Sequence, residues 1–167
     1  MTPSTLIGEA FVGEGPNAAH VNAVLGRKGG PVETAWTTAL ATPRQGHIPF
    51  VVVLQPSLPV KPLTLFVNKA DVRGERHANL TWGPAQAGVA KGVLEAVRSG
   101  SIPEDEVEEL LVIAAVWVDW SADDEAAVFA NNLESTKRAL SAAARGEPHL
   151  EELLGAGDPW NPFFRPD

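Results

Sequence analysis

The side chain best suited to proton transfer in this sequence is the imidazole of His20, which lies in a short apolar segment after a Gly- and Pro-containing turn. Imidazole can give and take a proton near neutral pH without a large shift of its pKa. The chain has four histidines, and no two have the spacing of a metal-binding pair on one helix or strand: His20, His47, His77 and His149. A metal site is therefore not expected, and a lone histidine on a strand is by itself more often structural than catalytic.

Two further polar residues lie where predicted elements begin or end. Lys69 ends a strand predicted over 63–69, and Gln86 falls in the first turn of a helix predicted over about 84–98. A lysine at a strand end is ordinarily solvated, and Gly83-Pro84 is a common turn signal. The free N–H groups at a helix start can nevertheless receive an anionic group, and an amide can recognise a heterocycle. These residue types permit a ligand site without requiring one.

The elements that must position these side chains are interspersed strands and helices. Apolar alternation and valine-rich runs predict strands over 5–12, 19–25, 50–54, 63–69 and 111–120. Helical spacing and helix-start signals predict helices over 31–41, about 84–98, from 101, and 121–144. Three prolines predict a stiff, extended connection between the third and fourth strands: Pro56, Pro59 and Pro62. The mixture predicts an α/β or α+β sandwich.

Composition limits the class of protein. The 167 residues fit one domain, 1–167, with a Pro- and Gly-rich tail over about 155–167 that we expect to lack regular structure. The net charge of −8 disfavours nucleic acid and anionic membranes as partners. No cysteine is present, which excludes disulfides, thiolate metal sites and cysteine nucleophiles. The N-terminus has no basic region followed by an apolar core, so we expect a cytoplasmic protein.

Three stretches considered together resemble the formaldehyde-activating enzymes, which condense formaldehyde with tetrahydromethanopterin. They are Gly8–His20, Leu63–Lys69 and Gly83–Gln86. The resemblance extends from about Ile7 to Gly146, with a weaker similarity at Asn161-Pro162-Phe163.

The resemblance implies a fold and an assembly. It implies an α+β fold similar to the second domain of a small-subunit ribosomal protein, with helices on one side of a mixed sheet. That fold contains a left-handed βαβ crossover, whereas general rules favour the right-handed one. It also implies a homo-oligomer, a pentamer with sites between subunits.

The resemblance further implies a carbon–oxygen lyase activity that needs tetrahydromethanopterin as co-substrate and no metal. His20 matches the family's catalytic acid. Lys69 and Gln86 match residues of its pterin site, and Val51 stands where a family leucine lines that site. Trp120 matches a family tryptophan, whereas Trp36, Trp82 and Trp117 stand where the family has phenylalanine. Core packing is the default role of these indoles, although one of them could stack on a pterin.

Two positions depart from the family pattern. Asn22 stands where the family has an aspartate two residues after the histidine, and Asp71 stands where it has a threonine two residues after the lysine. Asn22 can orient His20 but cannot contribute charge, and Asp71 could supply a carboxylate from another strand. Both are candidate binding residues. Two alternatives therefore stay open: a non-catalytic homologue that binds a pterin or an aldehyde adduct, and a related condensing enzyme that uses a different amine.

Overall fold

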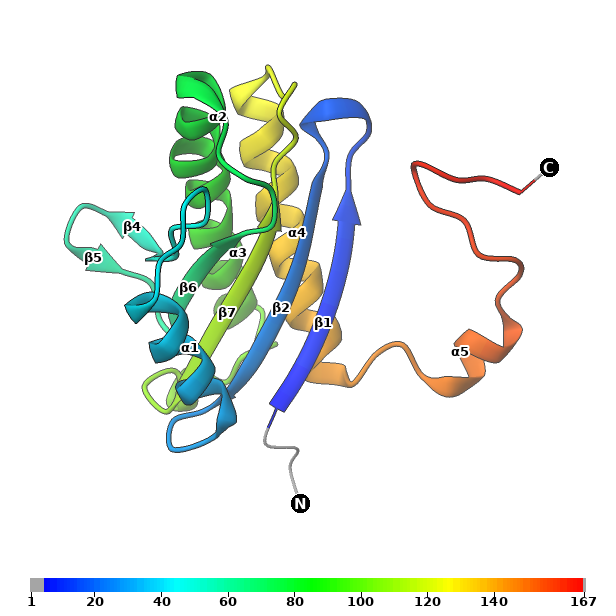
Figure 1. The fold of residues 1–167 in the computed structure, drawn as a ribbon. Helices are drawn as coiled ribbons and strands as arrows, with labels where there is room; N and C mark the ends of the chain where they lie inside the picture. The colour runs from blue at the N-terminus through cyan, green and yellow to red at the C-terminus, as the bar shows by residue number, and fades with distance from the viewer. Residues whose placement is uncertain (1–4, 167) are drawn as a thin grey trace.

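A five-stranded mixed sheet is the centre of the fold in the computed structural model, which describes residues 5–166 (Figure 1). The strand order is β1-β2-β7-β6-β3, with bounds Thr5–Val12, Ala19–Arg27, Leu110–Trp117, Leu63–Asn68 and Phe50–Val51. β6 and β7 are parallel, and the other neighbouring pairs are antiparallel. The ends of the predicted domain, residues 1–4 and 167, lie outside the described residues.

Helices cover both faces of the sheet. The helices are α1, α2, α3, α4 and α5, with bounds Pro31–Ala41, Gly74–Leu80, Gln86–Arg98, Glu125–Arg145 and Leu150–Gly155. α3 and α4 lie side by side behind the sheet, while α1 crosses the lower part of its front (Figure 1). The α+β class is confirmed, but α1 departs from the one-sided arrangement that the resemblance implied. The handedness of the crossover from β6 through α2 and α3 to β7 stays a prediction.

The alternation of side chains along each strand divides the core in two. In β2, Val21, Ala23 and Leu25 point toward α3 and α4 and are buried in the larger cluster. The intervening residues of β2 lie on the face that α1 partly covers. A smaller cluster fills the space beneath α1: Val32, Trp36, Leu65 and Leu111. Because successive side chains point to opposite faces of the sheet, each strand contributes residues to the core behind the sheet and to its front face.

The helices behind the sheet approach backbone so closely that only glycine fits at certain positions. A Cβ placed on Gly8 of β1 would lie 1.9 Å from the carbonyl oxygen of Ala139 in α4. A Cβ on Gly88 of α3 would lie 2.5 Å from the carbonyl oxygen of Phe129, also in α4. These glycines allow α4 to pack directly against both β1 and α3.

Several predicted elements differ from the structure, and the strand predicted over 50–54 is divided between β3 and the short strand β4 (Val53–Gln55) that follows it. The helix predicted from Pro84 begins earlier, because α2 continues into α3 through a π-helical turn over Thr81–Ala85. The prolines do not form an extended connection, because β4 and β5 (Leu58–Pro59) form a hairpin around Ser57, whose φ is 66°. The helix predicted from residue 101 is only a 3₁₀ turn, Glu104–Glu106.

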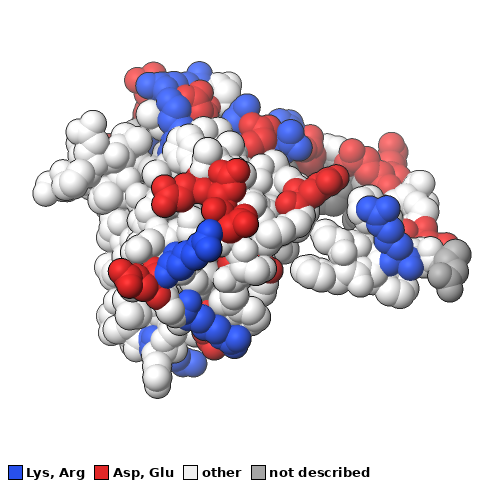
Figure 2. Space-filling view, turned by 90° about the horizontal axis from the view of Figure 1, so that it is seen from above, with Lys and Arg blue, Asp and Glu red and all other residues white. Residues whose placement is uncertain are grey.

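The chain beyond α4 leaves the body of the molecule. Gly146 ends α4 in the left-handed conformation, at a φ of 67°. α5 and the residues that follow it extend past the β1 side of the sheet (Figure 1) and stand apart from the body when the molecule is seen from above (Figure 2). We call residues 147–166 the C-terminal arm. None of the helices within residues 5–166 is long and apolar enough to cross a membrane.

Candidate functional site

The front face of the sheet carries a polar group beyond the part that α1 covers. His20 and Asn22 alternate with the buried residues of β2, so both side chains project to this face. Lys69 directly follows β6, and its backbone N–H donates to the carbonyl of Val116 in β7, which extends the parallel ladder by one residue. β7 lies between β2 and β6, so side chains 49 positions apart in the sequence converge above it.

The side chains form a continuous network. The Lys69 ammonium lies 3.0 Å from Nδ1 of His20 and donates to Oδ1 of Asn22 at 2.8 Å. On the other side of the ring, Nε2 of His20 lies 2.8 Å from Oε1 of Glu9 in β1. An ammonium group can only donate, so Nδ1 accepts from Lys69 and Nε2 carries the hydrogen that faces Glu9.

The electrostatics favour a neutral imidazole and an easily deprotonated lysine. Burial lowers the pKa of His20, the Lys69 charge lowers it further, and Glu9 acts in the opposite direction. Burial also lowers the pKa of Lys69 to about 8, against a smaller raising effect of the Glu9 charge. The site therefore favours the neutral imidazole of His20, while Lys69 can exchange its proton near pH 8.

Aromatic side chains flank His20 on both neighbouring strands. Phe11 of β1 pairs with His20 in the register, and the two ring centroids are 6.1 Å apart. Trp117 of β7 pairs with His20 from the other side and meets Trp120 edge-on at 5.8 Å. The Arg73 guanidinium lies 3.7 Å from the centre of the Trp120 ring. The site thus has flat apolar surfaces beside its titratable groups.

Asp71 makes its contacts in the loop after β6. Its carboxylate lies 2.6 Å from Nε2 of His47, and its backbone carbonyl accepts from the indole N–H of Trp120 at 2.9 Å. His47 is held in turn, because its Nδ1 lies 2.9 Å from the carbonyl oxygen of Asn68. Asp71 is therefore tied to the aromatic pair and to His47, and the carboxylate beside His20 belongs to Glu9.

The remaining predicted site residues, Val51 and Gln86, lie in different surroundings. Val51 of β3 packs against the cluster beneath α1, which agrees with a core role. Gln86 is buried at the start of α3, and its side-chain carbonyl accepts from the backbone N–H of Val53 at 2.7 Å. This bond fixes the hairpin of β4 and β5 to α3. Of the predicted site residues, His20, Asn22 and Lys69 are thus in direct contact.

The sequence reasoning did not single out Glu9 and did not distinguish Trp117 from the other tryptophans. The signal for Glu9 was its place in β1, where period-two alternation puts it on the face opposite Ala10. Its proximity to His20 depends on the register of β1 against β2, in which Glu9 pairs with Asn22. That register could not be read from the separate segments.

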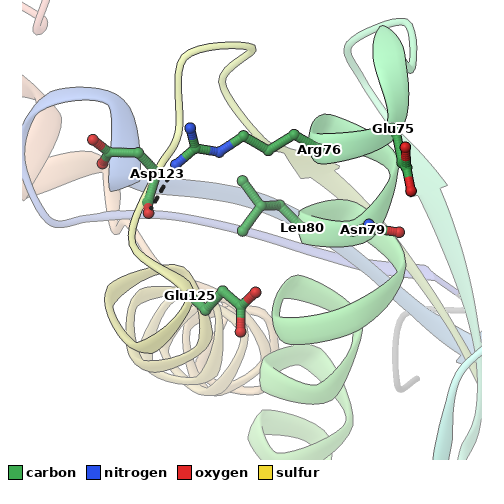
Figure 3. A pocket seen from close by; sticks show the side chains of 6 residues that line it. All are labelled: Glu75, Arg76, Asn79, Leu80, Asp123 and Glu125. Atoms are coloured by element: carbon green, nitrogen blue, oxygen red, sulfur yellow. Dashed lines mark hydrogen bonds between the residues drawn. The ribbon is translucent and has the colours of Figure 1, made fainter.

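A separate hollow lies between α2 and the start of α4 (Figure 3). It encloses about 290 Å³, and Arg76 crosses it to donate to the backbone carbonyl of Asp123 at 3.2 Å. None of the predicted site residues lines it; its walls are Glu75, Arg76, Asn79, Leu80, Asp123 and Glu125. Among residues 5–166 no group of three or more His, Cys, Asp or Glu side chains is arranged to hold a metal ion.

A mixed sheet with an acid–base network on its open face fits the class of proteins that the sequence resembles, and comparison identifies the family. The family model described as formaldehyde-activating enzyme (Fae) matches residues 7–161. The chain belongs to this family, which confirms the resemblance noted in the sequence.

Curated relatives cover most of the chain. A protein of Methanosarcina barkeri named 5,6,7,8-tetrahydromethanopterin hydro-lyase is 43% identical over 160 residues, which are 96% of this chain and 90% of that protein. A protein of Methanococcoides burtonii named bifunctional enzyme Fae/Hps is 42% identical over 153 residues. A protein of Archaeoglobus fulgidus with the same name is 38% identical over 158 residues. The matched region spans only 39% and 40% of these two longer relatives.

Proposed function

We propose that this protein condenses formaldehyde with tetrahydromethanopterin to give methylene-tetrahydromethanopterin and water, with His20 as the general acid. The observation that carries the proposal is the contact between Lys69 and His20, because it joins the family's pterin-site lysine to its acid in one network. Membership of the formaldehyde-activating family and the hydro-lyase name of a relative support the same reaction.

The reaction needs a proton donor at the step in which the carbinolamine loses its hydroxyl group. Attack of a ring amine on formaldehyde gives a carbinolamine, whose hydroxyl leaves poorly as hydroxide. His20 donates a proton to that oxygen as the carbon–oxygen bond breaks, and water departs. The second amine then closes the methylene bridge and releases a proton. A positioned general acid contributes roughly 10²–10⁴-fold to such a step, and holding both amines near the one-carbon unit contributes through orientation.

The pterin site is assigned to side chains around this network. Lys69 supplies a charged donor, Asn22 orients it, and the Trp117 indole next to His20 offers a face on which a ring can stack. Val51, Asp71 and Gln86 are assigned to the same site because they occupy family site positions, although Val51 and Gln86 make their contacts outside the network of His20 and Lys69. No metal is assigned a role.

A steady-state assay tests the proposal. Methylene-pterin formation is measured above the spontaneous rate, with tetrahydromethanopterin and with tetrahydrofolate, for the wild-type protein and a His20→Ala variant. We expect acceleration with tetrahydromethanopterin that the variant loses. A wild-type protein that only matches the spontaneous rate refutes the catalytic function.

The alternative function is a pterin- or aldehyde-adduct-binding protein without catalysis. It is favoured by Asn22, which places a neutral amide where the family has a carboxylate, and by Asp71, whose carboxylate is engaged by His47. Calorimetric titration with tetrahydromethanopterin separates the two. Binding of tetrahydromethanopterin without acceleration of the condensation supports this alternative. If the substrate is a different amine, the protein accelerates condensation with that amine alone.

We also propose a homo-oligomer built through the C-terminal arm, with the pentamer that the family resemblance implies as its size. Six large apolar side chains of the arm are 57–87% exposed: Leu150, Leu153, Leu154, Trp160, Phe163 and Phe164. Apolar surface of this extent marks an interaction site. A second copy fits as the occupant, because the edge strand β1 of each copy exposes Ile7 and Phe11.

Light scattering coupled to size exclusion tests the assembly. The wild type should elute as an oligomer, and a Leu153→Asp/Phe163→Asp double variant as a smaller species with unchanged circular dichroism. A monomeric wild type contradicts the proposal. The cytoplasmic location expected from the sequence stays a prediction.

A further inference from the structure

We propose that Glu9 and Lys69 hold opposite nitrogens of His20, with Glu9 as the positioning residue at Nε2 and Lys69 as a cover on Nδ1 that a bound pterin draws away. The inference rests on the proposed function for its last step. It assigns a role to Glu9, which no family match had indicated, and a second role to Lys69.

The Nε2 side of the ring is the permanent support. The Glu9 carboxylate lies 2.8 Å from Nε2, and β1 fixes it there through a continuous antiparallel ladder with β2 that runs from Thr5 to Val12. A carboxylate that accepts from one imidazole nitrogen sets the tautomer and stabilises the cation that forms when the other nitrogen is protonated. Glu9 is thus placed to do what Asn22, a neutral amide, cannot do.

The Nδ1 side is covered in the ligand-free protein. The Lys69 ammonium donates to Nδ1 at 3.0 Å, so this nitrogen has no free lone pair and faces a positive charge. A protonated His20 would bring two cations together, which is why the same contact disfavours the charged imidazole. In this state the neutral imidazole is favoured, so Nδ1 does not carry the proton that the reaction needs.

A pterin can change this arrangement through Lys69 alone. The lysine side chain is long, and among residues 5–166 its other hydrogen-bond partner is the amide oxygen of Asn22 at 2.8 Å. A carbonyl oxygen of a reduced pterin that accepts from the ammonium removes it from Nδ1. Among the described residues, the charge that then acts on His20 is that of Glu9, which opposes the effect of burial, so His20 takes up a proton more readily when the substrate is present.

The protons balance over one turnover. Once Lys69 has moved, Nδ1 takes up one proton from solvent. Nδ1 gives that proton to the carbinolamine hydroxyl as the carbon–oxygen bond breaks, and water leaves an iminium ion. The second amine attacks the iminium carbon and loses its own proton, which returns to Nδ1. No net proton is consumed, and Nε2 keeps its hydrogen bond to Glu9 throughout.

Nitrogen NMR of the histidine rings tests the proposal in the ligand-free protein. In the wild type, the His20 signals should report hydrogen on Nε2 and an unprotonated Nδ1. A Glu9→Gln variant should show a lower pKa of His20 than the wild type, and Lys69→Met a higher one. Glu14→Gln and Lys91→Met are the matched charge controls and should leave His20 unchanged. A wild-type tautomer with hydrogen on Nδ1, or unchanged titration in either site variant, overturns the proposal.

Added tetrahydromethanopterin tests the uncovering step. The pKa of His20 should rise in the complex, and the kcat of Glu9→Gln should fall with little change of KM. At a pH above the pKa of His20, each unit by which the variant lowers that pKa reduces the protonated fraction of the imidazole about tenfold. A pterin that binds without moving the His20 titration overturns the uncovering. A protein that binds no pterin refutes the proposed function instead, and the ligand-free spectra still decide the arrangement of Glu9, His20 and Lys69.

Discussion

The carboxylate of Asp71 lies 2.6 Å from Nε2 of His47, and the two side chains join the loop after β6 to the loop before β3. The Asp71 backbone carbonyl also accepts from the indole of Trp120, so these two loops hold the tryptophan that packs against Trp117 beside His20. The carboxylate beside His20 is therefore that of Glu9, whereas the Asp71 carboxylate contacts His47.

The Asp71→Ala variant should fold with little loss of stability. The pair is 53% and 39% exposed at Asp71 and His47, and exposed ion pairs contribute between zero and about 1 kcal/mol. Urea denaturation followed by circular dichroism should therefore show a decrease of less than about 1 kcal/mol in the free energy of unfolding. A decrease of more than about 2 kcal/mol would mean that the pair anchors the loops more strongly than its exposure indicates.

Replacing His20 by alanine should lower kcat by roughly 10²–10⁴-fold, which is the usual contribution of a general acid. Pterin affinity should change little, because a proton donor acts on the barrier rather than on ground-state binding. Single-turnover kinetics and calorimetric titration measure the two effects separately. His149→Ala, in the C-terminal arm, is the control. Unchanged turnover in His20→Ala would remove this residue from the mechanism.

The Lys69→Met variant should bind tetrahydromethanopterin about tenfold more weakly or worse. A charge-assisted hydrogen bond contributes about 1.5–3 kcal/mol, which corresponds to at least a tenfold change in Kd. Methionine keeps the length of the side chain and removes its charge. Lys91→Met, on the far side of the molecule in α3, should bind as the wild type does. Equal affinity in all three proteins would exclude Lys69 from the pterin site.

The pH dependence of stability should carry a signature of Lys69. Burial lowers its folded-state pKa to about 8, whereas the unfolded chain has the ordinary value of 10.5. Between these values the unfolded state holds more protons, so this residue makes stability rise with pH across that window. Below pH 8 the buried charge costs stability in full. Denaturant midpoints from pH 7 to 10 should therefore rise more for the wild type than for Lys69→Met, and parallel curves would contradict the lowered pKa.

The Gly8→Ala variant should be severely destabilised. Its Cβ would lie 1.9 Å from the Ala139 carbonyl oxygen and 2.8 Å from the Ala143 backbone N, so α4 must move away from β1. Inserting a group into a packed core costs typically about 1–3 kcal/mol, and a clash with backbone lies at the upper end or beyond. Thermal unfolding measures the loss. Gly155→Ala, where a Cβ meets open space, should be close to neutral.

The strands of the sheet were predictable because their apolar patterns are strong. Period-two alternation gave β1 and the start of β2, and continuous apolar runs gave β6 and β7 within a few residues of their bounds. The break expected at Gly83-Pro84 was wrong because the chain remains helical there. Proline has no N–H for a hydrogen bond within the helix, and the wider π-helical turn over 81–85 accommodates this while α2 continues into α3.

The site was predictable only in part, for a physical reason. His20 and Lys69 were found through the family resemblance, and their convergence follows from a strand order in which β7 separates β2 from β6. Glu9 was missed because its role exists only through the pairing of β1 with β2, where it lies diagonally across from His20. The pattern of a single segment predicts which face of the sheet a residue occupies. It does not predict the register between two strands, which determines the residue's neighbours.

The alternation of β2 also affects how this protein can diverge. Its inward residues hold α3 and α4 to the sheet, while His20 and Asn22 point away from that core. A substitution at position 22 therefore changes the polar face of the sheet and leaves the packing of that core intact. The open face of β2 can therefore differ between relatives while its buried face keeps the residues that hold the sheet to the helices.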